Sequence, residues 1–447
     1  MPLPAGPTTP AAVQVVRWIR SPFQVMAECH ARFGDAFTMR LPGMGGVVVV
    51  ADPLAVKEVF GMGPDEGHAG KANFLLAPVL GRHSLLLLDG AEHLRQRKMI
   101  LPAFHGERMH AYGRTMLDVA SASIDAWPLG EAFPVHRPMQ EITLQIILRT
   151  VFGVEEGPRF VELADALKRM LDATANPILL FPFMQRDLGR LSPWGRFKVQ
   201  ARRASDILRS EIRRGREKGS SGRLDVLAMM LDARDEKGRP LSEDEVHDEL
   251  VTLLVAGHET TATALAWTLR WVLPDRALVG RLNEELATAD GDPARIGKLP
   301  LLDATVKESL RLQPVIPMVG RVLQQATTVG GLDLPAGALV APSIYLVHRR
   351  PSLYPEPERF RPERFLDFKP AAWEWLPFGG GLRRCVGAAF AMYEMKMVLA
   401  ATLPRVEMRL ALDRVRGVRR TVTVTPEQGL PVVVTTKRSR ASLRTAA

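Results

Sequence analysis

The sequence predicts a mainly α-helical protein with a small β-rich lobe, which is an α+β fold. Of its 447 residues, 46 % are apolar and only 6 % are aromatic. Such a composition is typical of a globular protein with a large core rich in helix-forming residues. From about residue 54 to 315, most segments carry the apolar spacing of amphipathic helices. We see no Gly/Ser linker, and therefore expect a single domain over residues 1–447.

The predicted elements follow in order along the chain. Residues 1–10 are Pro-rich and predicted to be flexible, and "GDAFTMRLPGMGGVVVVADP" (34–53) predicts a β-hairpin, since two apolar runs flank a Pro/Gly turn. After the helical region, short β-like runs occupy 317–345 and a Pro-rich irregular segment covers 350–385. A helix is predicted over 386–402, β-like runs over 405–435, and a flexible basic tail over 437–447. The β lobe is thus assembled from distant parts of the sequence.

The charge of the chain bears on the kinds of partner that it can bind. The net charge is +10, and basic residues gather in 196–223 and 435–447. A basic surface can bind nucleic acid, an acidic protein or an anionic cofactor, but it can also be a solvated helix face and a frayed tail. No aromatic residues alternate with these runs, so we expect no nucleic-acid partner.

The same reading indicates a cytoplasmic protein. We find no apolar run long enough to span a membrane and no secretory signal. Cys29 and Cys385 cannot form a disulfide framework, which suits a reducing compartment. No G-x-G-x-x-G follows a strand and no P-loop is present, so flavin and nicotinamide binding by the usual fingerprints is not expected.

Cys385 lies in a glycine-rich loop, "FGGGLRRCVG", just before a predicted helix. A helix N-terminus offers free N–H groups and a positive dipole, and we expect these to lower the pKa of the thiol. The upstream glycines, Gly379 among them, and the small residues after Gly387 would let a flat, bulky group lie against the loop, with Arg383 adding positive charge. The alternative is an inert buried cysteine after a glycine turn.

The stretch "VTLLVAGHETTATALAW" (251–267) places polar residues in an apolar helix. Ser242 and Glu245 predict a capping box at the start of this helix. Gly257 costs about 1 kcal/mol in mid-helix, and Thr260 can donate to the Ala256 carbonyl and bend the helix. Glu259 adds an acid beside this hydroxyl. The alternative is a core helix that tolerates a glycine.

Two further patterns combine charged residues. Glu308 and Arg311 are three residues apart and share a helix face, as in an ordinary surface ion pair, while "FRPERF" (360–365) supplies Arg364. His93 and Arg97 in "GAEHLRQRKMILPAF" (90–104) are four apart, which a plain basic helix face would also show.

Together these motifs resemble the cytochromes P450 over essentially the whole chain. The loop satisfies Phe-x-x-Gly-x-Arg-x-Cys-x-Gly with Phe378, Gly381, Arg383, Cys385 and Gly387. The resemblance implies the P450 fold, a triangular prism of helices around haem b, with Cys385 thiolate as the iron ligand. "LPAFHGERMHAYG" and "WLPFGGGLRRCVGAAFA" are similar to a cyanobacterial and myxobacterial subgroup linked to fatty acids and terpenoids.

The resemblance also implies roles for the remaining motif residues. Thr260 and Glu259 would deliver protons to O2 in the groove at Ala256 and Gly257. Phe378, Gly379, Arg383 and Gly387 belong to the cysteine loop, and His93, Arg97, Arg321 and Arg383 would bind the haem propionates. Glu308, Arg311 and Arg364 would form a buried network that braces this loop.

The implied activity is insertion of one oxygen atom of O2 into a C–H or C=C bond. Electrons would come from ferredoxin and ferredoxin reductase, which a basic surface on the cysteine side can attract, and the protein is expected to be a monomer. We see no charged residue placed for a polar substrate, and expect a terpenoid, fatty acid or polyketide. The candidate pocket residues, each also compatible with ordinary core packing, are Phe74, Leu75, Leu76, Val79, Phe181, Phe183, Leu253, Ala256, Val315, Ile316, Met318 and Leu430.

Other activities remain open from the sequence. One alternative is a peroxygenase or a haem-thiolate isomerase or dehydratase. The Glu259–Thr260 pair argues against these enzymes, because none of them needs a proton relay. A non-catalytic haem sensor is a further alternative. Turnover with peroxide alone, against turnover with reductant and O2, separates the first alternative from a monooxygenase.

Overall fold

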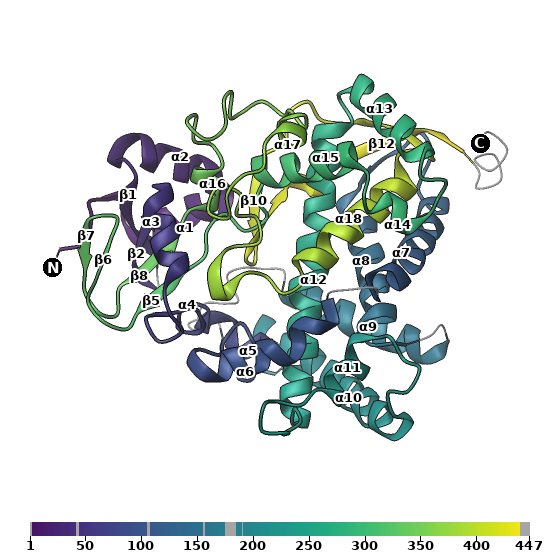
Figure 1. Cartoon of the computed structure of the whole chain (residues 1–447), viewed down its shortest axis with the longest axis horizontal. Coiled ribbons are helices and arrows are strands. Elements are labelled where there is room, and N and C mark those ends of the chain that lie inside the picture. Colours follow the sequence, from purple (N-terminus) through teal and green to yellow (C-terminus); the bar gives the residue numbers. More distant parts are fainter. Residues whose placement is uncertain are drawn as a thin grey trace.

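The computed structural model describes residues 2–41, 44–104, 108–154, 157–174, 185–189 and 191–438. These residues form a mainly helical molecule with small β-sheets, which confirms the predicted fold class. The strands β1, β2, β5 and β8 and the first helices lie on one side, and most of the long helices lie on the other (Figure 1). None of the helices in the described ranges has both the length and the apolar character of a membrane span.

The largest sheet of the described residues is built around the predicted hairpin. β1 (Ala36–Leu41) pairs antiparallel with β2 (Gly45–Val50), and β2 pairs parallel with the distant β8 (Leu339–Pro342). β5 (Arg321–Leu323) and β3 (Gly67–His68) complete the order β1-β2-β8-β5-β3. Valines 47 to 50 are all buried and alternate between two separate cores, so this strand is covered on both faces.

Three smaller sheets use the remaining strands of the described chain. β6 (Thr327–Val329) pairs with β7 (Leu332–Leu334), and β12 (Pro431–Lys437) lies between β4 (Ala132–Pro134) and β9 (Val406–Leu410). β10 (Gly417–Arg420) and β11 (Thr423–Pro426) form a hairpin. The Trp267 Nε1 donates to the Val424 carbonyl, and the Val424 N–H donates to the Val315 carbonyl, which anchors this hairpin to the helical core.

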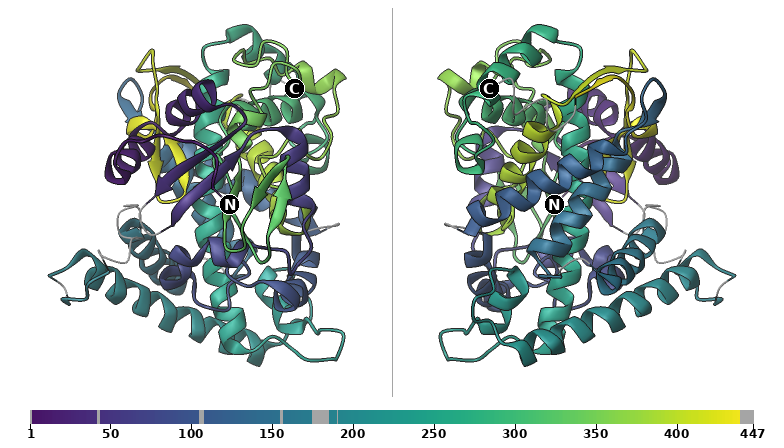
Figure 2. Two further views of the ribbon diagram at one scale, coloured as in Figure 1. Left: turned by 90° about the vertical axis from the view of Figure 1, so that its left-hand side faces the viewer. Right: turned by 90° about the vertical axis from the view of Figure 1, so that its right-hand side faces the viewer.

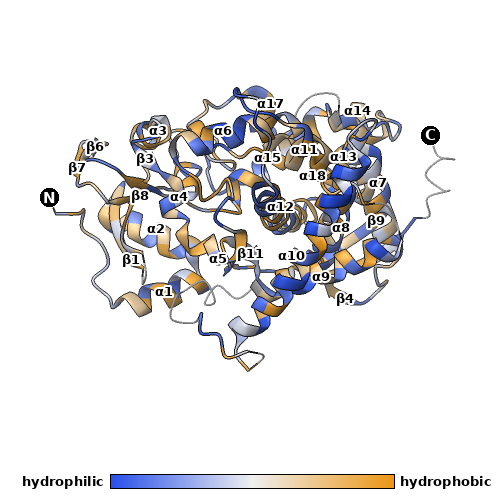
Figure 3. Cartoon of the chain, turned by 90° about the horizontal axis from the view of Figure 1, so that it is seen from below, coloured by the Kyte–Doolittle hydropathy of each residue, from blue (hydrophilic) through white to orange (hydrophobic). Residues whose placement is uncertain are grey.

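The longest described helix, α12 (Glu243–Val272), runs through the middle of the molecule (Figures 1 and 3). Its first turn has the predicted capping box between Ser242 and Glu245. The Thr260 hydroxyl donates to the Ala256 carbonyl as expected, and the helix continues without interruption for 30 residues. Gly257 lies close to α8 (His136–Thr150), because an added Cβ would be 3.3 Å from Ile147 Cδ1.

The other helices surround α12 and the sheets. α18 (Ala388–Thr402) follows the cysteine loop and packs against α12 and α7 (Arg108–Asp125) (Figure 1). α10 (Pro193–Lys218) extends along one edge of the molecule (Figure 2). The remaining helices are α1 (Ala11–Arg20), α2 (Pro22–Phe33), α3 (Pro53–Gly61), α4 (Ala69–Ala72), α5 (Ala77–Leu80), α6 (Gly90–Ile100), α9 (Pro158–Thr174), α11 (Val226–Asp232), α13 (Arg276–Ala287), α14 (Pro293–Ile296), α15 (Pro300–Leu312), α16 (Ile344–Val347) and α17 (Arg364–Asp367).

The two ends of the chain differ in how far the structure tests their predicted flexibility. Near the N-terminus, the Thr38 N–H of β1 donates to the Ala5 carbonyl, and Gln14 Nε2 donates to the Pro7 and Thr9 carbonyls. This part of the flexible segment predicted at 1–10 therefore packs along the sheet. Of the tail predicted at 437–447, residues 439–447 lie outside the described residues.

Candidate active site

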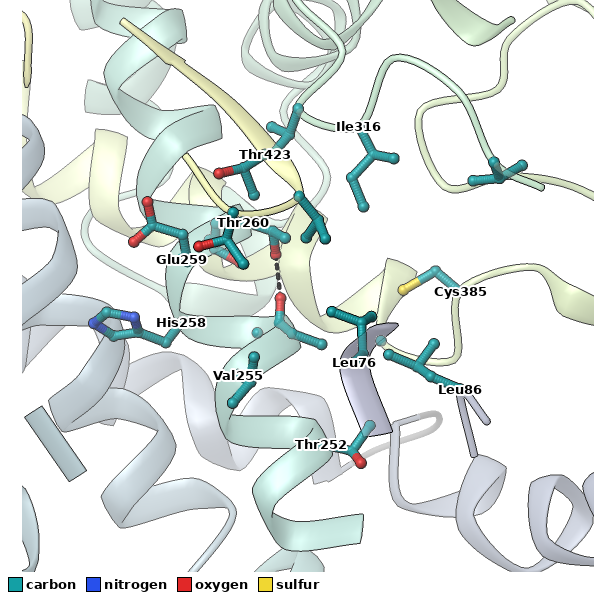
Figure 4. Close-up of a pocket in the computed structure, with 18 of the residues that line it drawn as sticks. Leu76, Leu86, Thr252, Val255, His258, Glu259, Thr260, Ile316, Cys385 and Thr423 are labelled. Carbon is teal, nitrogen blue, oxygen red and sulfur yellow. Dashed lines mark hydrogen bonds between the residues drawn. The ribbon is translucent and has the colours of Figure 1, made fainter. Parts of the chain in front are cut away.

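A single cavity of about 1000 Å³ connects the cysteine loop, the middle of α12 and the β10–β11 hairpin. This volume is in the upper range of small-molecule sites. In Figure 4, Cys385 points its sulfur across the cavity toward α12, with Leu76, Leu86 and Ile316 around the space. The residues that the sequence marked as chemically important therefore meet in one place.

The cysteine loop is shaped by close contact with α3. Gly381 has a φ of +62°, and a Cβ there would lie 1.8 Å from the Phe60 carbonyl oxygen. Only glycine allows this approach. The Cys385 N–H donates to the Phe378 carbonyl over 2.9 Å, and this hydrogen bond closes the loop. The sulfur thereby faces the cavity from a fixed position.

The thiol of Cys385 is enclosed by protein but open to the cavity. Burial raises the pKa of Cys385, while the Gly387 backbone N–H and the nearby Arg97 oppose this rise. The expectation of a lowered pKa is therefore wrong for the unligated thiol, since α18 begins only at Ala388 and burial is the larger effect. A thiol that binds a metal ion loses its proton as a consequence of coordination.

Basic side chains line the same end of the cavity. Within the described chain, Arg97 and Arg321 form no ion pair with a carboxylate, and burial lowers the pKa of Arg321 to about 10. Arg383 is different, because it pairs with Asp89 and donates to the carbonyls of Leu85 and Leu88. Burial and the three arginines lower the pKa of His93 to about 3, so His93 is neutral and offers one N–H donor and one acceptor nitrogen.

This set of residues fits haem b. The Cys385 thiolate would bind the iron, and Arg97 and Arg321, which form no ion pair within the described chain, would bind the two propionates. The glycine loop leaves the sulfur uncovered. The fit rests on Cys385, Arg97 and Arg321, with Arg383 already held by Asp89.

On α12, Thr260 and Glu259 point in different directions. Figure 4 shows Thr260 on the cavity side and Glu259 and His258 on the side away from Cys385. Glu259 accepts a hydrogen bond of 2.6 Å from Gln140 and lies 3.7 Å from both His136 and Arg420. Burial raises the pKa of Glu259, and Arg420 opposes this. The carboxyl group can therefore hold a proton at the edge of the cavity.

The three charged residues of the predicted brace lie together and are buried. Glu308 accepts from Arg311 over 2.7 and 2.9 Å and from Arg364 over 3.0 Å. Arg311 also donates to the carbonyls of His348 and Pro357. His348 Nε2 in turn accepts from the Leu376 N–H, two residues before Phe378. The network thus connects α15 to the start of the cysteine loop.

Most of the predicted pocket residues line the cavity, with three kinds of exception. Phe74 does not line it and is 44 % exposed, because it lies on the outer side of its 3-10 turn. Leu430 is fully buried in the main core, and Gln428 and Gly429 line the cavity instead. Phe181 and Phe183 lie outside the described residues. The residues that do line the cavity are Leu75, Leu76, Val79, Leu253, Ala256, Val315, Ile316 and Met318.

Several residues of the cavity wall, most of them charged, were not predicted from the sequence. Arg419 and Arg420 both line it, and so do Glu249 of α12 and Trp18 of α1. Adjacent arginines in a strand point to opposite faces, so one meets α1 and the other meets Glu259. "GVRRTVTV" predicts a hairpin, but nothing local in it predicts which surface receives it.

Comparison with known proteins identifies the class of protein. The family model described as Cytochrome P450 matches residues 3–430, so the chain belongs to the cytochrome P450 family. It is therefore a haem-thiolate monooxygenase with haem b as cofactor and O2 as co-substrate.

Named relatives and solved structures agree with this assignment. The chain is 42 % identical over 417 residues to "Putative cytochrome P450 135B1" of Mycobacterium tuberculosis, covering 91 % of this chain and 86 % of that protein. It is 37 % identical to "Putative cytochrome P450 135A1" of the same organism, covering 89 % and 87 %. Among solved structures it matches "Retinoic acid bound cyanobacterial CYP120A1" with a TM-score of 0.83 and 25 % identity, covering 97 % and 100 % of the two chains. It also matches the cytochrome P450DA heme domain with a TM-score of 0.82 and 24 % identity, covering 98 % of each chain, which supports the fold alone.

Proposed function

We propose that this monooxygenase oxidises a lipophilic small molecule, a terpenoid, fatty acid or polyketide, at a C–H or C=C bond. The observation that carries this proposal is the largely apolar wall opposite Cys385, in the cavity of about 1000 Å³ that the haem and the substrate would share. Leu76, Leu86, Leu253 and Ile316 offer no hydrogen bond to a polar ligand, so affinity there comes from burial of apolar surface. The retinoic acid bound to the solved cyanobacterial P450 is a ligand of this kind.

The residues at and near the cysteine loop would form the haem-binding site. Cys385 would bind the iron, Gly387 would donate its N–H to the sulfur, and Arg97 and Arg321 would bind the propionates. When bound, the haem supplies the oxygen-activating chemistry. Arg383 and Asp89 hold the loop to the segment before α6. His93 would contribute an N–H rather than a charge.

Thr260 and Glu259 would handle protons on the α12 side. The Thr260 hydroxyl donates its proton to the Ala256 carbonyl. Its oxygen can therefore accept a hydrogen bond from a donor in the cavity. Glu259 would hold the proton, because burial favours its neutral form. Since its carboxyl group faces away from Cys385, transfer requires rotation of the side chain or an intervening water.

Separate proteins, a ferredoxin and its reductase, would supply the electrons. Arg384 is exposed beside Leu382, which is 41 % exposed, on the loop that carries Cys385. A positive charge next to an apolar contact suits an acidic ferredoxin. We place the enzyme in the cytoplasm. We also expect it to be a monomer, and gel filtration tests this oligomeric state.

The test of this function is turnover of retinoic acid by the haem-loaded protein. Product should form with NADH, ferredoxin, ferredoxin reductase and O2. Glu259→Gln should reduce this turnover by about 100-fold, the usual scale of a lost proton donor, and Glu259→Asp should restore part of it. Product formed with hydrogen peroxide but not with reductant and O2 would favour a peroxygenase. Haem binding without turnover of any lipophilic probe would favour a sensor.

A further inference from the structure

The cavity wall contains a half-buried positive charge that is not among the residues assigned to the haem. Arg419 of β10 lines the cavity, and its guanidinium lies 5.1 Å from the centre of the Trp18 ring of α1. Its Nε donates to the Thr421 carbonyl over 3.0 Å. Within the described chain its two terminal NH2 groups have no hydrogen-bond partner and no carboxylate.

The other cations in this part of the cavity are paired. Arg420 lies 3.7 Å from Glu259, Lys168 lies 3.2 Å from Glu141, and Arg137 lies 3.8 Å from the same Glu141. Arg419 differs from these, because no carboxylate among the described residues pairs with it. Burial alone lowers the pKa of Arg419, to about 10, so the side chain remains charged at neutral pH. A charged guanidinium whose two terminal NH2 groups lack acceptors gains stability when an anionic ligand pairs with it.

Arg419 is also held in place for binding. β10 and β11 pair in register from Gly417–Pro426 to Arg420–Thr423, and the Trp267 and Val315 contacts anchor β11 from behind. Trp18 is 3 % exposed, and the guanidinium of Arg419 makes a cation–π contact with its ring. Its own Nε1 is buried without a hydrogen-bond acceptor. A guanidinium in a fixed plane suits the fork of a carboxylate.

We propose that Arg419 is a specificity-determining residue that binds the carboxylate of an amphipathic substrate, whose apolar body extends through the cavity toward Cys385. The proposal rests on the monooxygenase function and narrows its substrate to lipophilic carboxylic acids. One unpaired guanidinium matches a singly charged carboxylate better than a phosphate, which would need a second cation. The hairpin end of the cavity lies beside α12, where Thr423 marks it in Figure 4. A substrate held there would present carbon atoms far from its carboxylate to the haem.

The expectation that no charged residue is placed for a polar substrate differs from the structure, in which Arg419 lines the cavity. The basic character of "GVRRTVTV" was visible in the sequence, but the cavity is visible only in the fold. The substrate is still expected to be lipophilic, but it would carry a carboxylate at one end.

The experiment compares acids with their methyl esters by isothermal titration calorimetry on the haem-loaded protein. The probe pairs are all-trans-retinoic acid with methyl retinoate, and lauric acid with methyl laurate. At least one acid should bind at least tenfold more tightly than its ester, or about 1.4 kcal/mol. Arg419→Gln should remove this difference by weakening the acid alone, and Arg419→Lys should restore part of it. The matched control is Arg416→Gln, which removes an exposed arginine before the same strand and should leave both affinities unchanged.

Three results would overturn the proposal. They are equal binding of acid and ester by the wild type, equal weakening of both by Arg419→Gln, and no binding of either acid. The second would mean that Arg419 only packs on Trp18. Calorimetry does not depend on oxygen chemistry, and a reduced carbon monoxide spectrum of the same sample reports the haem separately. A wild type that shows no preference for acid over ester, with an intact spectrum, therefore refutes only the carboxylate site.

Discussion

Glu308 shows how a single buried side chain connects distant parts of this P450. Its carboxylate accepts from Arg311 on the same helix and from Arg364, 56 residues further along the chain, and all three are almost fully buried. Such networks add little net stability relative to apolar residues, but they penalise every arrangement in which one partner is missing. Here the favoured arrangement is the one that places the cysteine loop.

Glu308→Gln should therefore destabilise the protein strongly. Two buried guanidiniums would lose the charge that they share, and the free energy of unfolding in urea should fall by about 3–5 kcal/mol. Asp165→Asn, which removes an exposed i,i+4 partner of Arg169, should cost less than about 1 kcal/mol. A loss for Glu308→Gln as small as that of the control would contradict the proposed brace.

Glu249 of α12 makes stability depend on pH. Burial raises the pKa of Glu249 to about 7, against 4.5 for an ordinary glutamate, and Asp248 adds to the rise. The folded protein then holds a proton that the unfolded chain has released, so stability should fall as pH rises from about 4.5 to about 7 and change no further above that. The full contribution is about 3 kcal/mol.

Glu249→Gln tests this pH dependence. The amide can still accept from the Leu85 N–H but has no proton to lose. Urea unfolding of both proteins should show the variant gaining about 3 kcal/mol on the wild type between pH 4.5 and pH 7. A difference between the two proteins that is the same at every pH would show that Glu249 keeps an ordinary pKa.

At the scale of elements, α12 is the axis from which the site is built. It carries Thr260 and Glu259 and packs against α8, α15 and α18. Its start is fixed by the reciprocal bonds of Ser242 and Glu245. The cysteine loop and the β10–β11 hairpin both follow α12 in the chain and line the same cavity as this helix.

Ser242→Ala should destabilise the protein by about 1 kcal/mol, the usual cost of losing an N-cap acceptor. The Glu245 N–H would lose its partner at the solvent-exposed end of α12. Thermal or urea unfolding measures this change, and Ser221→Ala, at an exposed loop position, serves as the neutral control. Equal stability of the two variants would mean that the capping box contributes nothing to folding.

At the scale of the whole molecule, much of the fold follows from local sequence signals. The hairpin at 34–53, the helix after Cys385 and the β-rich C-terminal part appear where the apolar spacing predicts them. The parallel pairing of β2 with β8 does not, since no local pattern specifies a partner nearly 300 residues away. Pairings of this kind depend on the packing of the complete chain.

The candidate site divides in the same way. Fixed spacings in the sequence point to Cys385, Thr260 and the Glu308 network. The cavity wall was less predictable, because an apolar residue such as Leu430 packs equally well into the core. Arg419 was missed because its surroundings come from α1, about 400 residues earlier. A charged residue can be recognised as a ligand-binding residue only when its burial and its interaction partners in the fold are known.

The net charge of +10 should govern encounter with the electron donor. The rate of reduction by an acidic ferredoxin should fall about tenfold when NaCl is raised from about 20 to about 300 mM, because salt screens the attraction. Stopped-flow spectroscopy measures this rate, and a neutral small-molecule reductant should show no such change. A ferredoxin rate that is insensitive to salt would rule out electrostatic steering.

The central claim is that Cys385 holds a haem iron as thiolate within this cavity. Its most direct test is the absorption spectrum of the purified, haem-supplied protein after reduction and exposure to carbon monoxide. The wild type should give the red-shifted Soret band after which the P450 family is named, and Cys385→Ser should lose it. A band typical of thiol- or histidine-bound haem in the wild type, or no haem band in folded protein, would show that Cys385 does not bind the iron as thiolate.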